Sequence, residues 1–290
     1  MKVGFIDYYL NEWHANNLPT WIREETNGEM TVAYAYAMIE KPEEALGEHD
    51  LTNREWAEKE NVELLDTIEE LVEKSDVIVV LSPNNPEMHE VLSDIPLRSG
   101  KPTYVDKTFA PDVDSACRMI KKALDHNTPM FTSSALRFSK ELKDVERKGV
   151  QTIGMRGPGP FDIYSIHQVE PIVSFMGGTP EKVMFTGTNE HPGMTIRFSG
   201  DRWASTQHYD WECPFNMAIN YADGAPCSYV NACTDFFPGF VTELVKFFRT
   251  GIAPVEYEQT LAVAAILQYA FIAQETPGEW VDIPPYKLEK

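Results

Sequence analysis

The stretch DVIVVLSP at residues 76–83 is an apolar, β-branched run that stops at a serine and a proline. A run of this kind, ended by turn residues, predicts a buried strand. Residues 2–6 (KVGFI), 30–38 (MTVAYAYAM) and 102–106 (PTYVD) are similarly apolar, and helix-length segments separate them. Strands that alternate with helices build right-handed βαβ units, so the first part of the chain predicts a Rossmann-like, doubly wound parallel sheet.

The segments between these strands carry helix signals. Thr52, with Glu55 three residues later, has the spacing of a capping box at the start of a Glu-rich helix. Further helices are expected at residues 16–25, 64–74, 87–93 and 113–125, and a short strand at 129–132.

The pattern changes after about residue 133. Strand-like segments follow one another at 152–156, 182–188, 194–198, 202–209 and 226–233, separated by glycine-containing turns. Two helices are expected at residues 239–249 and 256–274. We therefore predict an α/β domain over residues 1–132, followed by an α+β domain over 133–290 with an open, mostly antiparallel sheet.

The charge balance excludes some classes of partner. The chain has 25 Lys and Arg against 45 Asp and Glu, a formal net charge of −20. Such a surface repels phosphate backbones and anionic lipids, so neither nucleic acid nor a membrane is an expected partner. The longest apolar run, 261–273, contains Gln268 and is too short to span a bilayer. With no leader-like start and four cysteines at no recognisable spacing, a cytoplasmic location is expected.

The segment after the first strand departs from a dinucleotide-binding loop. A Gly-x-Gly-x-x-Gly loop lets the backbone approach a pyrophosphate at a helix N-terminus. Here the three glycine positions hold Asp7, Tyr9 and Glu12. Two carboxylates at this place oppose an anion.

The next motifs indicate a family. Ser82-Pro83-Asn84 and then His89 follow the strand at 76–81, and GKPTYVDKT occupies residues 100–108. This order resembles the Gfo/Idh/MocA family of glucose–fructose oxidoreductases and inositol dehydrogenases, in which Thr-Pro-x-x-x-His precedes Gly-Lys-x-Val-x-x-Glu-Lys-Pro. Asp106-Lys107-Thr108 stands at the Glu-Lys-Pro position, with the lysine and an acid but without the proline.

The resemblance extends over nearly the whole chain. Ala135-Leu136-Arg137-Phe138 is similar to the family's entry to its second domain, and His167 with Glu170 is similar to its His-x-x-Asp. The last helix and the segment around residues 280–283 match as well. The glycine loop, the missing proline and Ile163, which stands where the family has an acid, depart from the pattern.

The resemblance implies hydride exchange between NAD or NADP and a sugar, polyol or related small polyhydroxy compound. It implies Lys107 as the base or its orienter and His167 as the proton partner, and these two are the predicted catalytic residues. Arg137, Tyr164 and Glu170 would bind substrate. The cofactor would contact Ile6, Asp7, Tyr8, Tyr9, Ser82, Pro83, Asn84, His89, Asp106 and Lys107. A homodimer or homotetramer through the open sheet is also implied.

Two alternatives from other classes remain open. The same fold serves a ligand-binding or scaffold protein that has lost its cofactor, in which Tyr8, Tyr9 and Trp13 fill the pyrophosphate site. A metal-dependent hydrolase or lyase would use Asp162, His167 and Glu170. No resident metal is predicted.

Overall fold

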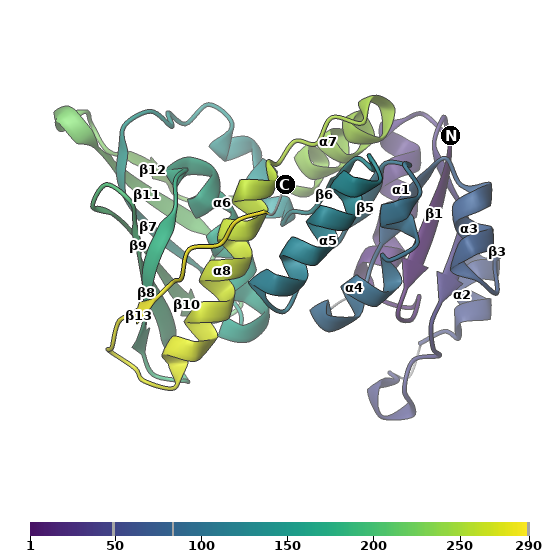
Figure 1. The fold of residues 1–290 in the computed structure, drawn as a ribbon, viewed down its shortest axis with the longest axis horizontal. Coiled ribbons are helices and arrows are strands. Elements are labelled where there is room, and N and C mark those ends of the chain that lie inside the picture. The colour runs from purple at the N-terminus through teal and green to yellow at the C-terminus, as the bar shows by residue number, and fades with distance from the viewer. Residues whose placement is uncertain (48–49, 83, 289–290) are drawn as a thin grey trace.

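The computed structural model describes residues 1–47, 50–82 and 84–288, which form two β-sheets side by side with helices between and around them (Figure 1). The first sheet is parallel throughout, in the order β3-β2-β1-β4-β5-β6. Its strands are β1 (Lys2–Asp7), β2 (Thr31–Ala37), β3 (Glu63–Leu64), β4 (Val77–Val80), β5 (Thr103–Val105) and β6 (Met130–Phe131). The predicted parallel sheet is confirmed, with the short edge strand β3 as an addition.

Helices cover both faces of this sheet, because strands that are apolar on both sides must be buried on both sides. Side chains of β1 and β4 such as Val3 and Val79 pack in one core cluster with α1 (Trp13–Glu25), α2 (Asn53–Glu60) and α7 (Phe237–Thr250). The opposite face packs on α3 (Ile68–Lys74) and α5 (Val113–Asp125), beside the short α4 (His89–Leu92). The late helix α7 therefore completes a core that begins with the first strand.

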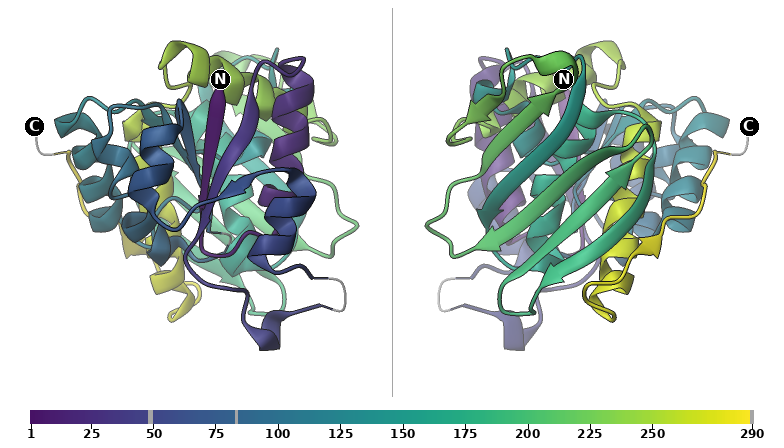
Figure 2. Two further views of the ribbon diagram at one scale, coloured as in Figure 1. Left: turned by 90° about the vertical axis from the view of Figure 1, so that its right-hand side faces the viewer. Right: turned by 90° about the vertical axis from the view of Figure 1, so that its left-hand side faces the viewer.

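The second sheet is mixed, in the order β12-β11-β7-β10-β9-β8-β13. Most of its pairs are antiparallel, as predicted, and β7 with β10 is a parallel pair. α6 (Phe161–Met176) and α8 (Tyr257–Gln274) cover one face, and the other face is uncovered (Figure 2). The strands are β7 (Val150–Pro158), β8 (Pro180–Gly187), β9 (Pro192–Phe198), β10 (Arg202–Tyr209), β11 (Asn216–Tyr221), β12 (Ser228–Val230) and β13 (Val281–Asp282).

Helix α6 was not expected from the sequence, although it carries several predicted site residues. It begins after Pro160 and contains Pro171, a residue that normally interrupts a helix interior. Most of its side chains are buried, so it has no polar face to mark a helical period. Packing against both the sheet and α8 stabilises a segment that its local pattern does not identify.

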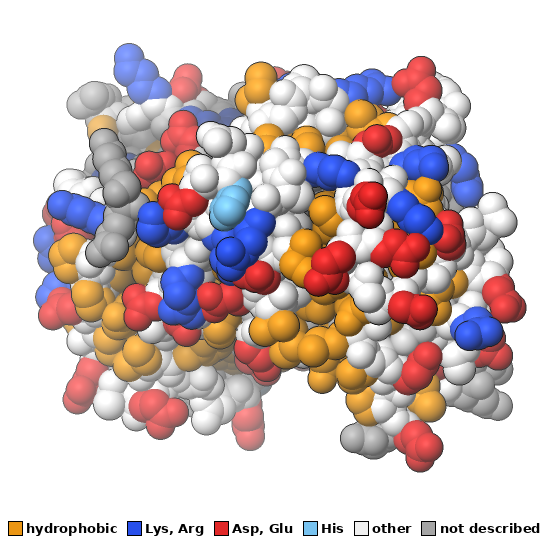
Figure 3. Space-filling model, turned by 45° about the vertical axis from the view of Figure 1, so that its right-hand side comes forward, with side chains coloured by type: hydrophobic (Ala, Val, Ile, Leu, Met, Phe, Trp, Pro, Cys, Tyr) orange, Lys and Arg blue, Asp and Glu red, His pale blue; other side chains and the backbone are white. Residues whose placement is uncertain are grey.

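The surface carries acidic side chains over much of the face in Figure 3, and a notch lined partly by hydrophobic side chains separates the two lobes at its lower edge. Within the described ranges, no helix is long and apolar enough to cross a membrane.

Candidate active site between the two sheets

A cavity of about 500 Å³ lies where the carboxyl end of the first sheet meets α6 and the start of α7. The carboxyl ends of parallel strands are the usual place for ligands in this kind of sheet. The cavity is lined by Glu12, Trp13, His14, Asn84, Tyr104, Asp106, Lys107, Ser133, Ala135, Leu136, Ile163, Tyr164, His167, Trp211, Phe215, Phe236, Phe237 and Phe240.

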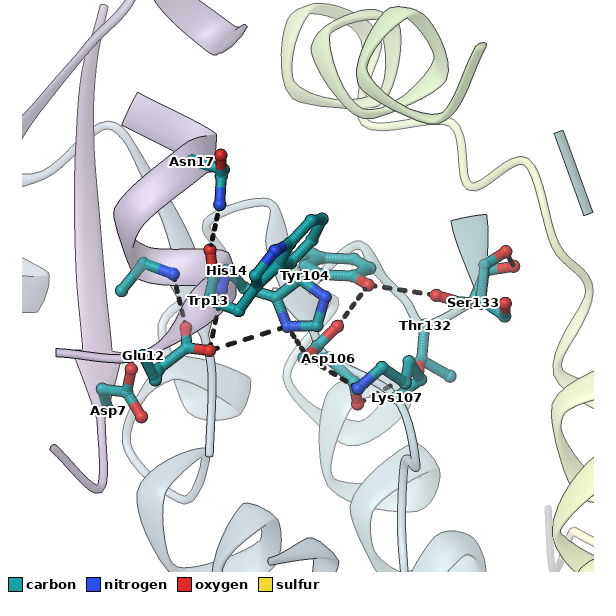
Figure 4. Close-up of polar contacts among 12 residues, drawn as sticks. Asp7, Glu12, Trp13, His14, Asn17, Tyr104, Asp106, Lys107, Thr132 and Ser133 are labelled. Atoms are coloured by element: carbon teal, nitrogen blue, oxygen red, sulfur yellow. Dashed lines mark hydrogen bonds and ion pairs between the residues drawn. The ribbon is translucent and has the colours of Figure 1, made fainter. Parts of the chain in front are cut away.

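Asp106 and Lys107 follow directly after β5 and form the polar floor of the cavity (Figure 4). Lys107 Nζ lies 3.8 Å from Asp106 Oδ2, and the Tyr104 hydroxyl lies 2.9 Å from Asp106 Oδ1 as a donor. Burial acts to raise the pKa of Asp106, but the charges of His14 and Lys107 outweigh it and hold the pKa below its usual range. Asp106 is therefore a buried carboxylate that keeps its negative charge.

His14 belongs to the first turn of α1 and reaches across to Asp106. Its Nδ1 lies 2.9 Å from Asp106 Oδ2 and 3.9 Å from Glu12 Oε2. The imidazole also forms part of the cavity wall. The strand order brings this about, because β4 alone separates β1, which leads into α1, from β5, which leads into Asp106.

The N-terminus of α1 is closed by a side chain of the protein itself. The Glu12 carboxylate accepts hydrogen bonds from the backbone N–H groups of His14, at 2.7 Å, and Ala15. These are the donors that an anionic ligand uses at a helix N-terminus. Burial raises the pKa of Glu12, against the opposing effects of His14 and these hydrogen bonds.

The loop before Glu12 is equally self-contained. Tyr8 N donates to Asp7 Oδ1 at 2.7 Å, and Leu10 N donates to Asn53 Oδ1 at 2.9 Å. Asp7 is fully buried, and burial together with the neighbouring Glu12 carboxylate raises its pKa well above the usual range. In this chain, backbone N–H groups of the loop that binds pyrophosphate in dinucleotide-binding proteins thus already donate hydrogen bonds to side-chain oxygens of the protein.

Helix α6 places Tyr164 and His167 on the opposite wall. The two rings are 4.9 Å apart, and His167 Nδ1 lies 2.7 Å from Ser134 Oγ. Burial lowers the pKa of His167 to about 3, and the charge of Lys107 acts in the same direction. His167 is thus a neutral imidazole near neutral pH.

Arg137 and Glu170 lie behind the cavity and bind each other. Arg137 Nε donates to Glu170 Oε2 at 2.6 Å, and both side chains are buried. Ser133 Oγ donates to the same carboxylate oxygen at 3.2 Å, and Arg137 also reaches Gln259 on α8. The pair thus links the segment after β6, which carries Arg137, to α6 and α8. Neither side chain lines the cavity. Arg137 and Glu170 therefore hold segments of the protein together, and they do not make the expected contact with a substrate in the cavity.

Aromatic side chains from both parts of the chain form the rest of the walls. Trp13 packs on Phe237 with ring centroids 4.8 Å apart, and Trp211 packs on Tyr164 at 4.8 Å. Trp13 is 50% exposed and Trp211 is 64% exposed. Large aromatic rings left open at a cavity mouth indicate a ligand that presents a flat apolar face to them.

The predicted site residues thus divide into three groups. Asn84, Asp106, Lys107, Tyr164 and His167 come together around the cavity. Ile6, Asp7, Ser82 and His89 are fully buried nearby without lining it, and His89 Nδ1 is held 3.1 Å from the Phe109 carbonyl oxygen. Tyr8 and Tyr9, half-buried, are also outside the lining, and Pro83 lies outside the described residues.

The sequence analysis missed His14 as a polar group of the site. Its position after the first parallel strand was itself a signal, because side chains there reach the ligand-binding edge of the sheet. The residues after the first strand were interpreted through the missing glycines and the aromatic side chains, and His14 received no role. Tyr104, Trp211 and Phe237 were also missed, since nothing local distinguishes a cavity aromatic from a core one.

The proposed metal ligands do not form a cluster. Over residues 1–47, 50–82 and 84–288, no group of three or more His, Cys, Asp or Glu side chains could hold a metal ion. Glu170, one of the three candidates, is taken up by Arg137.

No protein-family model matches the chain, and no curated protein sequence matches it either. Solved structures match over nearly its whole length. Myo-inositol dehydrogenase from Lactobacillus casei, in complex with NAD(H) and myo-inositol, has a TM-score of 0.76 at 14% identity and covers 99% of this chain and 97% of that one. Apo scyllo-inositol dehydrogenase from the same organism has a TM-score of 0.75 at 13% identity, covering 97% and 98%.

A third match extends the range of ligands among these structures. The WlbA dehydrogenase from Bordetella pertussis, in complex with NADH and UDP-GlcNAcA, has a TM-score of 0.71 at 12% identity and covers 98% of this chain and 99% of that one. The chain therefore has the two-part fold of the inositol and sugar dehydrogenases, as the Gfo/Idh/MocA resemblance implied.

Proposed function

We propose that the protein is an NAD(P)-dependent oxidoreductase that transfers hydride to or from a sugar, polyol or related small hydroxy compound. The observation that carries this proposal is the cavity itself. It brings Lys107 and His167, from the two halves of the chain, to one space of about 500 Å³ at the carboxyl end of the parallel sheet. Proteins with this fold have been crystallised with NADH or NAD(H) and with myo-inositol or a UDP-sugar.

The residues fit the reacting end of the cofactor better than its diphosphate. The cavity has the flat aromatic walls and the Asn84 side chain that a nicotinamide ring would use, and a bound nicotinamide supplies the hydride acceptor or donor. At α1, however, Glu12 already accepts from the backbone donors. The diphosphate must therefore be held by other groups, or Glu12 must leave its position.

The lining also supports a substrate with a ring. Trp13 and Trp211 offer faces on which the C–H side of a sugar or polyol ring can stack, while Lys107, His167 and Asn84 offer hydrogen bonds to hydroxyl groups. Lys107 would hold the substrate oxygen and stabilise negative charge on it. His167, neutral near pH 7, would accept or donate one hydrogen bond to a second hydroxyl.

We further propose a homo-oligomer that forms through the uncovered face of the seven-stranded sheet. Tyr229 on this face is 62% exposed, which favours burial against a second copy. A reducing, cytoplasmic location is supported by the four free thiols. A monomer by light scattering at micromolar concentration would contradict the oligomer.

Titration of the purified protein with NADH and NADPH tests the function. Trp13 lines the cavity, so energy transfer from tryptophan to the reduced nicotinamide is expected, with calorimetry as an independent measure of saturation. The W13F variant should bind as tightly and lose only the share of the transfer that comes from Trp13, because Trp211 also lines the cavity. A screen of sugars and polyols would follow. No binding up to about a millimolar, the weak end of ordinary cofactor and substrate affinities, would contradict the proposal.

A further inference from the structure

His14 is a polar residue of the cavity to which the function above gives no role. It sits on the first turn of α1, where a dinucleotide-binding chain presents backbone donors to phosphate. In this chain that turn instead brings an imidazole to the cavity floor, with Nδ1 2.9 Å from Asp106 Oδ2 (Figure 4). Nδ1 and Asp106 Oδ2 are both buried and lack a well-aligned hydrogen bond within the described residues, so their contact is an ion pair. Nε2 is not buried, and none of the described residues forms a hydrogen bond with it.

Hydrogen bonds hold Asp106 in a position from which it can orient this imidazole. Tyr104 donates its hydroxyl hydrogen to Asp106 Oδ1, and Asp106 N donates to the Val80 carbonyl oxygen at 2.9 Å. Its second carboxylate oxygen faces His14 and Lys107. When the imidazole is neutral, a carboxylate beside Nδ1 favours the proton on that nitrogen, which places the lone pair on Nε2.

The other candidates are less suited to proton transfer. Burial and the charge of Lys107 lower the pKa of His167 to about 3, and a base that weak accepts little proton density near neutral pH. Lys107 Nζ forms an ion pair with Asp106 Oδ2 at 3.8 Å, and the proposed function uses it to hold the substrate oxygen. The charged and titratable groups that face His14 are thus Glu12 on its own helix, Asp106 and Lys107 after β5, and His167 on α6.

We propose that His14, oriented by Asp106, is the catalytic residue that exchanges the hydroxyl proton of the substrate, and that Lys107 stabilises the oxygen while this happens. In the oxidation direction the O–H proton goes to His14 Nε2. A bound oxidised nicotinamide would accept the C–H electron pair as hydride, and the C–O bond of the substrate would become a C=O bond. This inference rests on the proposed function for the hydride, but the orientation and reactivity of His14 are independent of it.

The orientation is tested on the free protein by nitrogen-15 NMR of labelled histidine side chains, with H14N to assign the signal. In neutral His14 the proton is expected on Nδ1, and D106N should shift it to Nε2, the usual position in free histidine. H126N, a change at an exposed histidine, is the matched control and should leave the His14 signal unchanged. A wild-type His14 with its proton on Nε2 would overturn the inference.

Reactivity gives a second measurement that needs no substrate. Diethyl pyrocarbonate attacks an unprotonated ring nitrogen that it can reach. His14 Nε2 is not buried, so His14 should be modified, whereas the fully buried His89 should stay unmodified, as followed by mass spectrometry. A His14 that resists the reagent as His89 does would mean that Nε2 is not available as a base and would overturn the inference, whatever the outcome with cofactors.

Turnover gives the third test. H14Q should lower kcat by about 10²- to 10⁴-fold, the usual contribution of a general acid–base group, with dinucleotide Kd unchanged. H14Q with D106N should lose little more than H14Q alone, because the two act as a unit. If the wild type turns over and H14Q keeps its rate, His14 is not the proton carrier. If the wild type shows no nicotinamide-linked turnover, the proposed function fails, and the two measurements on the free protein still decide the orientation and reactivity of His14.

Discussion

Two buried aspartates at the same edge of the first sheet behave in opposite ways. Asp7 ends β1 and Asp106 follows β5, and both side chains are removed from water. Burial and the Glu12 carboxylate raise the pKa of Asp7, whereas His14 and Lys107 overcome burial and lower the pKa of Asp106. Similar burial is therefore accompanied by opposite pKa shifts, and the neighbouring side chains decide the sign.

The difference divides the cleft into two halves. The carboxyl groups of Asp7 and Glu12 lie together beside α1, which disfavours an anion there. At β5 the carboxylate is paired with two groups that can carry positive charge, beside the space where a substrate would lie. Sheet geometry creates both positions, but the chemistry of each depends on side chains from distant parts of the chain.

The largest effect is expected from removing the lysine next to Asp106. K107M is expected to lower turnover by about 10²- to 10⁴-fold, because it removes the charge that would stabilise the substrate oxygen. Affinity for the dinucleotide should stay within about tenfold, or ~1.4 kcal/mol. K140M, a change at an exposed lysine 77% open to solvent, is the control and should keep its rate. Unchanged turnover in K107M would remove Lys107 from the mechanism.

Stability should separate the two aspartates directly. D106N leaves His14 and Lys107 without their carboxylate, and breaking a buried ion pair costs about 3–5 kcal/mol; the low end is expected because both partners reach solvent. D7N should cost less than about 1 kcal/mol, because an amide oxygen can still accept from Tyr8 N. Urea unfolding of both variants measures the difference. Equal losses would contradict the contrast.

The pH dependence of stability should have opposite signs at the two positions. The raised pKa of Asp7 means that the folded state binds more protons than the unfolded state above the ordinary value of 3.8, so stability falls as pH rises. The lowered pKa of Asp106 makes its contribution full above 3.8 and lost as pH falls below it. Relative to wild type, D7N should thus gain stability as pH rises above about 4, and D106N should lose its deficit in acid. Parallel curves would refute both assignments.

The smallest expected effect concerns the α1 half. E12Q removes the charge at the helix N-terminus and should tighten dinucleotide binding by ~0.3–1 kcal/mol, or about two- to fivefold. E258Q makes the same change in the first turn of α8, outside the cavity lining, and should not alter binding. No gain in E12Q, by calorimetry at low salt, would mean that the phosphates lie elsewhere.

Much of this arrangement follows from sequence, and some of it does not. The apolar runs at residues 2–6 and 76–81 were sufficient to predict the parallel sheet, because both faces of such strands are buried. The motifs around Lys107 and His167 led to two residues that do line one cavity. The division of the chain at residue 132 stays a prediction.

The contacts between side chains could not be predicted from the sequence in the same way. Arg137 and Glu170 looked like substrate ligands, but they are 33 residues apart and bind each other only because α6 forms despite its internal Pro171. His14 and Asp106 meet because of the strand order, which no local window contains. The pKa shifts of Asp7 and Asp106 depend on contacts of this kind, so they follow from the tertiary structure. Both residues come at the end of a strand, yet the shifts have opposite signs.

Helix α7 has a consequence for how the chain is made. Phe240 packs on Tyr104 of β5 at 5.4 Å and Phe247 packs on Phe131 of β6 at 4.8 Å, so this part of one face is covered by residues synthesised more than a hundred positions later. During translation the aromatic side chains of β5 and β6 stay exposed until the segment beyond residue 237 has emerged. Contacts so distant along the chain also slow folding. The two halves are therefore expected to reach their native state in one late, shared step.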